Sequence, residues 1–544
     1  AAWHRRLLQQ EASVLGYMDR RDEQIAAYDR YDARYDPDLT VLRIWPLVKL
    51  ARFDEAREIG NKLVHSDNAY VRQRALNGMM AIEEEAGNRM ASYEWGQKAM
   101  AATANESCVI NTNTALGARR VFKFAEAIAL DQQALKAPDK DCPTPPYAQL
   151  APVYLVGGRF QECLSTLQAL RATPLPADIR PHNQMVIKAR LVELLLALGA
   201  FEEAESRARE ILAAPDRMGY ESGSKELKEL GNNLLAWSVF DSRLAQLEER
   251  IAVRGLLDGV PLRFEAEQLA ITRAEARREA LRLALADQAL SRTVRPYFSD
   301  LMPWYGADMI RVFGHGMMGK AIDEAEAAER DVRKEAALFL DAYRGEAAWL
   351  DDDLTEARRL GERTLAALPE ETKLLRLRVE AWLADTLRRL GDAAAAERHF
   401  AAVMDFYPTV LRGLRIRLPV RLAGGVGPRS AAITDRLADS PRLLLQSQSR
   451  FVVDVRDEGK RIEICLQGAK RSCGVLDEEA IEALPEDADV IASAVDHFHD
   501  EVFAPRIELT QSDINSLDGR AVRQDARGAV DALLGREKKE QEKK

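Results

Sequence analysis

Gly314, Gly319 and Lys320 give the closest match in this chain to a motif that does chemistry. They satisfy the pattern GxxxxGK of a phosphate-binding loop, whose backbone amides and lysine bind phosphate groups. The next position needs Ser or Thr to bind magnesium, and here it is Ala321. The helical repeat described below instead places Met318 at the start of a second helix. We therefore expect a helix at this position and no nucleotide cofactor.

A cluster of metal-binding residue types lies at 496–501, where the sequence is DHFHDE. His497 and His499 are two positions apart, so on a helix they project to different faces. We expect an amphipathic helix in which Phe498 and Val502 pack inward and the polar residues are solvated. The sequence therefore predicts no metal site at this cluster.

A second segment, DINSLDG at 513–519, resembles a calcium-binding loop only in part. Leu517 stands where the third ligand is needed, and Asp518 stands where the loop needs glycine. Asp518 and Gly519 have instead the chemistry of a turn. We expect this turn to precede a final helix.

The densest basic patch consists of Arg412, Arg415, Arg417 and Arg421, which could bind an acidic partner or a phosphate. Arginines on the solvent face of an edge strand are the interpretation that we favour, because such charges also protect an edge from aggregation. The patterns GxSxG, HExxH and CxxC are absent, and the seven histidines are scattered. These observations predict a protein that is not an enzyme.

Four of the five cysteines are placed to form two pairs. Cys465 and Cys473 flank the turn-like segment QGAKRS, which would bring them across neighbouring strands of a hairpin. Cys108 and Cys142 lie 34 residues apart, near equivalent points of adjacent helical repeats. Cys163 occupies a position at which other repeats have alanine, so we expect a buried thiol that packs as a small apolar side chain.

Two disulfides would suit an oxidising compartment such as the bacterial periplasm or cell envelope, which we favour over the cytoplasm. Five unpaired thiols in a cytosolic protein fit the sequence equally well, because spacing alone does not establish pairing. The chain begins with Ala1 rather than Met, and this start is compatible with a removed signal peptide or an upstream domain.

The composition is typical of a folded, helix-rich protein. Of the 544 residues, 47% are hydrophobic and 30% are charged. The net charge of −10 argues against nucleic-acid binding, which normally depends on Lys and Arg neutralising phosphates. No uninterrupted apolar run approaches the roughly 20 residues that span a bilayer, so we expect no membrane insertion. The length exceeds that of one hydrophobic core, which favours several domains or a solenoid.

A helical pattern recurs six times, with a bulky or apolar residue three positions before a small one. Its clearest copies begin at Phe53, Phe124, Phe160 and Phe201, which lie 71, 36 and 41 residues apart, and a weaker copy at Arg89 divides the first interval. Two further copies, DDLTEA and GDAAAA, follow later in the chain. A period of about three dozen residues is typical of stacked helix pairs.

These units resemble the tetratricopeptide repeat, a helix-turn-helix unit of about 34 residues with glycine at the turn, then an aromatic residue, alanine and a terminal proline. The matching residues are Gly199, Phe201, Ala204, Ala208 and Pro215; Gly158, Phe160 and Pro174; and Ala357, Gly361 and Pro369. The resemblance implies a mainly α fold, an α-α superhelical solenoid of about ten helical pairs over residues 1–410. The copies are degenerate at 216–334, where other kinds of helical-pair repeat remain an alternative.

After Pro408 the pattern changes to that of a small α+β domain, which we place at 411–535. Residues 415–422 alternate charged and apolar side chains as a half-buried strand does, and Pro419 predicts an edge position. Further strands are expected at 450–455, 461–467 and 473–476, with helices at 430–440, 478–503 and 519–534. The last residues, 536–544, are expected to form a charged disordered tail, because they have nothing to bury.

The resemblance implies a non-catalytic scaffold or adaptor. A solenoid would bind a peptide or protein in the groove lined by the first helix of each unit, and the C-terminal domain would bind a second partner. The residues that we expect to contact the partner are Asn77, Asn111, Asn113, Gln149 and Lys188. An amide side chain suits this role because it can both donate to and accept from a peptide backbone.

Two other functions are compatible with the sequence. The C-terminal domain could be a ligand-binding or catalytic module that the repeats regulate, or the chain could be the sensor region of a larger multidomain protein. Binding of the partner by residues 1–410 alone would favour the scaffold, whereas ligand binding or turnover by 410–544 would favour the regulated module. The sequence specifies neither the partner nor an oligomeric state.

Overall fold

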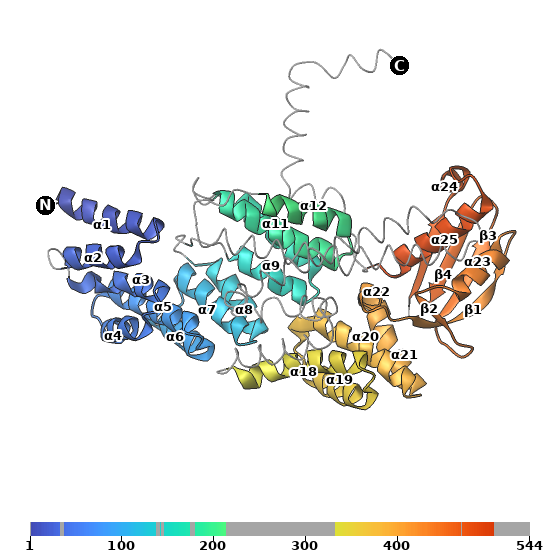
Figure 1. Cartoon of the computed structure of the whole chain (residues 1–544), viewed down its shortest axis with the longest axis horizontal. Coiled ribbons are helices and arrows are strands. Elements are labelled where there is room, and N and C mark those ends of the chain that lie inside the picture. The colour runs from blue at the N-terminus through green and yellow to red at the C-terminus, as the bar shows by residue number, and fades with distance from the viewer. Residues whose placement is uncertain are drawn as a thin grey trace, which may run out of the picture. The chain divides into compact units, whose positions relative to one another are not determined.

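The computed structural model describes residues 2–32, 37–137, 142, 146–173, 180–213, 332–468 and 470–504 (Figure 1). These residues are mostly helical, and one five-stranded sheet lies near the C-terminus. The phosphate-loop-like and calcium-loop-like segments, nearly all of the degenerate repeats, the expected last helix and the charged tail lie outside the described residues. The chain divides into two compact units. The described part of the first unit is 2–154 with 332–340, and that of the second is 155–213 with 341–504.

Helices joined by short turns make up the first unit. They are α1 (Ala2–Tyr17), α2 (Arg21–Asp32), η1 (Pro37–Arg43), α3 (Ile44–Lys49), α4 (Phe53–Leu63), α5 (Ala69–Glu85), α6 (Arg89–Ala102), α7 (Cys108–Arg120), α8 (Phe124–Ala134) and most of α9 (Tyr147–Val156). Helices from α1 to α8 pack on their neighbours in the chain, as α6 does on α5 and α7. Ile44, Met79 and Ile82 lie in the apolar core that these contacts create.

The second unit contains further helices. They are α10 (Phe160–Ala172), α11 (Arg180–Ala197), α12 (Phe201–Leu212), the part of α18 (Arg333–Leu350) that follows residue 340, α19 (Leu354–Ala367), η4 (Glu370–Thr372), α20 (Lys373–Arg389), α21 (Ala393–Phe406) and α22 (Thr409–Leu414). Trp382 of α20 is fully buried, and its indole ring fills the space left by Gly345 and Gly361. Small residues therefore let neighbouring helices accommodate one large side chain.

The residues at which the sequence pattern recurs are each the first residue of a helix. They are Phe53, Arg89, Phe124, Phe160, Phe201, Leu354 and Ala393. In six of these helices, the residue three positions after the first is the expected Ala or Cys. Each of these small residues is at most 2% exposed: Ala56, Ala127, Cys163, Ala204, Ala357 and Ala396. The recurring pattern thus marks the start of a helix and the point where that helix approaches its neighbour most closely.

A left-handed residue precedes each of these helices by two positions. These residues have φ between 56° and 87° and are Ala51, Gly87, Phe122, Gly158, Gly199, Asp352 and Gly391. At most of these turns the next backbone N–H donates to the carbonyl five residues earlier, as Asn88 does to Glu83 at 2.8 Å. This bond is the Schellman closure of a helix end. Glycine adopts this conformation freely, whereas Ala51, Phe122 and Asp352 adopt it against a steric cost at Cβ.

Ala51→Gly should therefore raise the free energy of unfolding by about 0.5–1 kcal/mol, because glycine relieves the strain of the left-handed turn. Gly87→Ala tests the same effect in the opposite direction. A Cβ added at Gly87 meets no atom within 4 Å, so its effect comes from the backbone conformation alone. Urea denaturation of both variants measures the difference, and an Ala51→Gly variant less stable than wild type would contradict this account of the turn.

Contacts between helices that are far apart in the chain occur within each unit. Phe122 stacks on Phe339 with ring centroids 4.6 Å apart in the first unit. In the second unit, the Tyr407 hydroxyl donates to the carbonyl of Ala197 at 2.6 Å, and the rings of Tyr407 and Phe160 lie 6.1 Å apart. A solenoid in which each repeat touches only its chain neighbours has no such contacts. These regions therefore depart from a purely sequential array.

The sheet contains β1 (Leu418–Val426), β2 (Leu443–Leu445), β3 (Val452–Asp457), β4 (Ile462–Gln467) and β5 (Arg471–Leu476), in the order β2-β1-β3-β4-β5. β1 runs parallel to β2 and β3, and the remaining pairs are antiparallel. Helix α23 (Ser430–Ala438) connects β1 to β2, and α24 (Glu478–Glu482) and α25 (Asp487–Val502) follow β5 (Figure 1). α23 and α25 pack on each other and on the sheet. The expected α+β pattern is thus present.

The expected edge position of the first strand is wrong. β1 pairs with β2 through residues 418–420 and with β3 from Arg421 onward, so it lies inside the sheet. Pro419 is tolerated because the backbone bonds to β2 are made by its neighbours: Leu418 N donates to Arg442 O, and Val420 O accepts from Gln446 N, both at 2.8 Å. The missing N–H of the proline is therefore not needed for this pairing.

Candidate functional site

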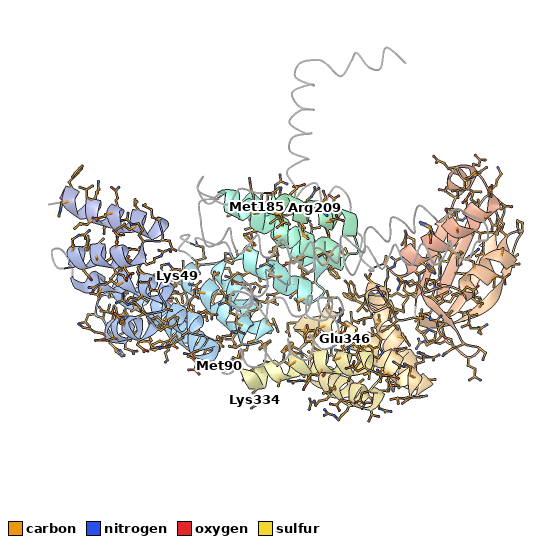
Figure 2. The ribbon with its side chains drawn as sticks, in the orientation of Figure 1. Lys49, Met90, Met185, Arg209, Lys334 and Glu346 are labelled. Carbon is orange, nitrogen blue, oxygen red and sulfur yellow. A yellow bond between two sulfur atoms is a disulfide. The ribbon has the colours of Figure 1, made fainter. Side chains whose placement is uncertain are left out.

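Side-chain contacts in the described part of the chain repeatedly join residues that are 36 positions apart. They are Lys49 Nζ to Glu85 Oε1 at 2.8 Å, Asn113 Nδ2 to Asn77 Oδ1 at 2.8 Å, Arg120 to Glu84, and Trp349 Nε1 to Asp385 Oδ2 at 2.9 Å. Lys49 lies on α3 (Figure 2). Each contact connects the first helices of successive helix pairs. Equivalent positions of neighbouring pairs therefore face one another at the repeat distance of 36 residues.

Asn77, Asn113 and Gln149 form what we call the amide row. They occupy α5, α7 and α9 at intervals of 36 residues, and each is half-buried. The amide of Asn113 donates to that of Asn77, and Gln149 follows in the same register. The Oε1 atom of Gln149 is shielded from solvent and has no hydrogen-bond partner. The next position in this register is Met185, so the row has three amides.

The amide row presents hydrogen-bonding capacity that its internal bond does not use. Each side-chain amide has two N–H donors and an acceptor oxygen, and the Asn113–Asn77 bond occupies one donor and one acceptor. Two helical turns further on, the same helices carry the ion pair of Arg120 and Glu84. The row is therefore a neutral polar strip flanked by a paired charge, and such a strip suits a backbone rather than a charged ligand.

The other two expected contact residues are placed differently. Asn111 is fully buried, and its Nδ2 donates to the carbonyl of Asn105 at 2.9 Å, which fixes the turn before α7. A side chain that closes a turn is not at the surface, so Asn111 is not part of the amide row. Lys188 lies on α11 and forms an ion pair with Glu210 at 2.7 Å. It belongs to the second unit and not to the amide row.

Arg119 and Asp131 are buried charged residues that the sequence analysis missed. The Arg119 guanidinium donates to the carbonyl of Gln149 at 3.2 Å and so links α7 to α9 beside the amide row. Burial raises the pKa of Asp131 well above the ordinary carboxyl range, and the opposing effect of Arg119 is smaller. Both residues look like solvated helix positions in the sequence, so no local signal distinguishes them.

Asp131→Asn should raise the free energy of unfolding at neutral pH. The raised pKa means that the folded protein binds this proton more tightly than the unfolded chain, so stability falls as pH rises above the unfolded carboxyl pKa of about 4. Asparagine does not titrate, so the free energies of unfolding of the variant and of wild type should become similar at about pH 4. Urea denaturation at both pH values tests it, with exposed Asp67→Asn as the control; an Asp131→Asn variant less stable at both values would refute the account.

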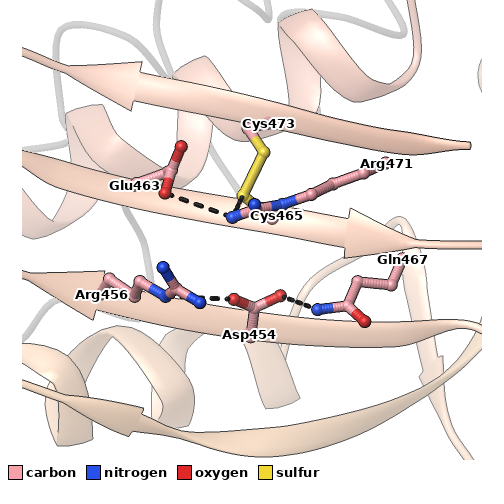
Figure 3. Close-up of a disulfide and its surroundings, with 7 residues drawn as sticks. All are labelled: Asp454, Arg456, Glu463, Cys465, Gln467, Arg471 and Cys473. Carbon is pink, nitrogen blue, oxygen red and sulfur yellow. Dashed lines mark hydrogen bonds and ion pairs between the residues drawn. A yellow bond between two sulfur atoms is a disulfide. The ribbon is translucent and has the colours of Figure 1, made fainter.

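The structure joins both expected cysteine pairs. Cys108, at the start of α7, is bonded to Cys142, and Cys465 of β4 is bonded to Cys473 of β5 (Figure 3). Cys163 is a buried free thiol, and burial raises its pKa, so it stays protonated. Cys163 lies on α10 at the position where other helices of the pattern have alanine.

The surroundings of Cys465 and Cys473 are polar. Arg471 Nη2 lies 3.0 Å from Cys465 Sγ and 3.3 Å from an oxygen of Glu463 (Figure 3). The possible ligand atoms of Glu463 and the two cysteines lie within 4.8 Å of one another. Both sulfurs are in the disulfide, and a metal ion binds thiolates, so this group offers one carboxylate and no metal site in its oxidised state.

The histidine cluster lies on one helix of the C-terminal region. Residues 496–501 lie in α25, where Phe498 and Val502 are fully buried as expected. The expectation of a solvated His499 is wrong: it is 1% exposed, and its Nε2 lies 2.8 Å from Ser440 Oγ. α25 packs on both α23 and the sheet, so it buries a wider face than an amphipathic surface helix does. Among the described residues, no metal-binding group includes a histidine.

Of the basic patch, Arg412 lies on α22 and is bonded to Asp500 at 2.7 Å. It is therefore not on a strand, contrary to expectation. Arg415 and Arg417 precede β1 in the chain, and Arg421 is an exposed residue of β1 itself. The four arginines consequently belong to different elements, and β1 is not an edge strand that they could protect.

The glycine-rich turn between β1 and α23 is a type of position that often binds anions. Here Asp457 fills it: its carboxylate accepts from the Arg429 backbone N–H at 2.7 Å and from the Arg429 guanidinium at 3.0 Å. Burial alone would raise the pKa of Asp457, but these bonds and that from Gly459 outweigh it and hold the pKa below the ordinary value. A Cβ at Gly427 would lie 1.8 Å from Asp457 O. The chain's own carboxylate thus takes the place of an external anion.

Purified protein, unfolded without reductant, should release one titratable thiol, that of Cys163, and full reduction should release five. The experiment is a thiol titration with a chromogenic disulfide reagent. Cys163→Ala provides the control, because it should lower both numbers by one. Five thiols before reduction, in protein isolated from its native compartment, would contradict both pairings.

Comparison with known proteins gives no relative. No family model, no curated protein and no solved structure matches this chain. Among the described residues, no helix has both the length and the apolar character that crossing a bilayer requires.

Proposed function

We propose that this chain is a non-catalytic scaffold or adaptor that binds an extended segment of a protein partner along the amide row. The observation that carries the proposal is the 36-residue spacing of Asn77, Asn113 and Gln149, with one amide bond between the first two. A partner in extended conformation offers a backbone N–H and C=O at every residue. The unused amide groups of Asn77 and Asn113 and the side-chain N–H groups of Gln149 are the groups that such a backbone needs, whereas Gln149 Oε1 is shielded from it.

The helix pairs that hold the row are, in this proposal, of the tetratricopeptide kind. Three features that occur together in successive repeats support this assignment. They are a left-handed turn residue, an apolar residue that begins a helix, and a buried small residue three positions later. First helices line the binding face in repeats of this architecture. The amide row lies on first helices, so its position agrees with a binding role.

A second partner would bind the C-terminal α+β domain, and the protein would act in an oxidising compartment. The two disulfides support this location, because structural disulfides are rare in the cytosol. The domain's sheet carries a mixed-charge face formed by Asp454, Arg456, Glu463 and Arg471, which is the kind of surface that sets the orientation of a partner.

The double variant Asn77→Ala/Asn113→Ala should weaken partner binding roughly tenfold, since each lost hydrogen bond contributes about 0.5–1.5 kcal/mol. Asn77 and Asn113 bond to each other, so replacing both together leaves no unpaired amide behind. Asn61→Ala is the matched control, because Asn61 is an exposed amide on the second helix α4. Partners are first captured on immobilised full-length wild-type protein and identified by mass spectrometry, and affinities are then measured in solution by calorimetry.

Urea denaturation of the double variant must show that it remains folded under the binding conditions. The proposal requires that the captured protein lose affinity for the double variant and keep it for Asn61→Ala. Equal affinity for both variants, or the absence of any protein that binds wild type saturably, would refute the amide row as the binding site.

A further inference from the structure

The disulfide of Cys465 and Cys473 lies on the face of the sheet that is opposite to α25. A Cβ added at Gly474 would lie 2.5 Å from Phe498 Cα, so the Gly474 side of β5 faces that helix. Side chains alternate along a strand, and Cys473 therefore projects to the other face. Cys465 is its direct partner in the register of β4 and β5.

The two sulfur-bearing residues differ in access to solvent. Cys465 is fully buried, whereas Cys473 is half-buried and lies on β5, the strand at the edge of the sheet. A reagent in solution therefore reaches Cys473 more readily. In an exchange reaction the attacked sulfur must be accessible, and the other sulfur leaves.

Arg471 is placed to stabilise a negative charge on the buried sulfur. Its Nη2 lies 3.0 Å from Cys465 Sγ, closer than to its carboxylate partner Glu463 at 3.3 Å (Figure 3). A neighbouring cation lowers the pKa of a thiol, and a thiol of lower pKa leaves faster. Glu463 opposes this effect with its own charge, but it also holds the guanidinium beside the sulfur.

We propose that Cys465–Cys473 is a thiol-exchange site that reacts with a small-molecule thiol. The thiolate of the small molecule attacks Sγ of Cys473, the bond between Cys473 and Cys465 breaks, and its electron pair goes to Cys465 Sγ as a thiolate beside Arg471. A second small-molecule thiolate attacks the mixed disulfide at the small molecule's sulfur and releases Cys473 as a thiolate. The protein gains two electrons, and two thiols are oxidised to one disulfide.

This inference goes beyond the scaffold function and does not depend on it, because the amide row contributes no atom to the exchange. The Cys108–Cys142 disulfide serves as an internal reference. Like the Cys465–Cys473 bridge, it joins a buried cysteine, Cys108, to a half-buried one, Cys142, so access to solvent is similar at the two bridges. The Cys465–Cys473 bridge has Arg471 beside its buried sulfur, and we therefore expect a small thiol to open it faster.

Folded full-length protein is incubated with reduced glutathione at neutral pH, quenched with an alkylating agent at intervals and analysed by peptide mapping. Cys465–Cys473 should be opened roughly three- to tenfold faster than Cys108–Cys142, in keeping with the dependence of exchange on the leaving group. Equal rates for the two bridges would show that the arginine beside Cys465 gives this bridge no advantage. That result would overturn the proposal with wild-type protein alone.

Arg471→Gln should slow opening of Cys465–Cys473 by roughly three- to tenfold, because the leaving thiolate loses its cation. Arg456→Gln is the matched control: Arg456 lies on the same sheet face, and its ion pair is with Asp454 at 3.7 Å. Arg471→Lys should restore part of the rate. An Arg471→Gln variant that exchanges as fast as Arg456→Gln would overturn the assigned role of the guanidinium.

Single-cysteine variants identify the attacked sulfur. With oxidised glutathione, Cys465→Ser should form a mixed disulfide at Cys473 faster than Cys473→Ser does at Cys465, because only Cys473 is accessible. Intact-mass spectrometry measures both rates. Faster modification of Cys465 would reverse the proposed direction of attack and overturn it.

Discussion

The helical part of this protein depends on how each helix ends. A residue with positive φ reverses the chain two positions before the next helix, and its neighbour's N–H closes the preceding helix by a bond to the carbonyl five residues earlier. Because this closure is the same at Gly87, Gly199 and Gly391, successive helices leave their turns in the same way. The small residue three positions into the new helix then fixes how closely it packs.

From this local constraint follows the register of 36 residues. When turns and close approaches recur at equal intervals, polar side chains on first helices meet their equivalents one period away, as Asn113 meets Asn77 and Arg120 meets Glu84. The spacing of the amide row is thus set by the packing of the helices. Specificity can arise there because the positions between the packing residues are free to vary.

The parts of the fold that sequence could predict are those set by neighbours in the chain: the helix starts, the buried small residues and four of the five strands. The three-residue β2 was missed, because LLL at 443–445 shows no alternation. The single helix expected at 478–503 is two helices, and Pro485 between them was a signal that the prediction overlooked. Burial of His499 depends on Ser440 and α23, which are distant in the chain, so no local pattern reveals it.

The bridge between Cys108 and Cys142 also has a mechanical consequence. It spans α7 and α8, so a chain pulled from its two ends transmits tension through the sulfur–sulfur bond and not through that helix pair. Helices α7 and α8 therefore do not unfold under this force for as long as the disulfide is intact. An adaptor stretched between two partners would keep this segment folded while the rest of its chain bore the force.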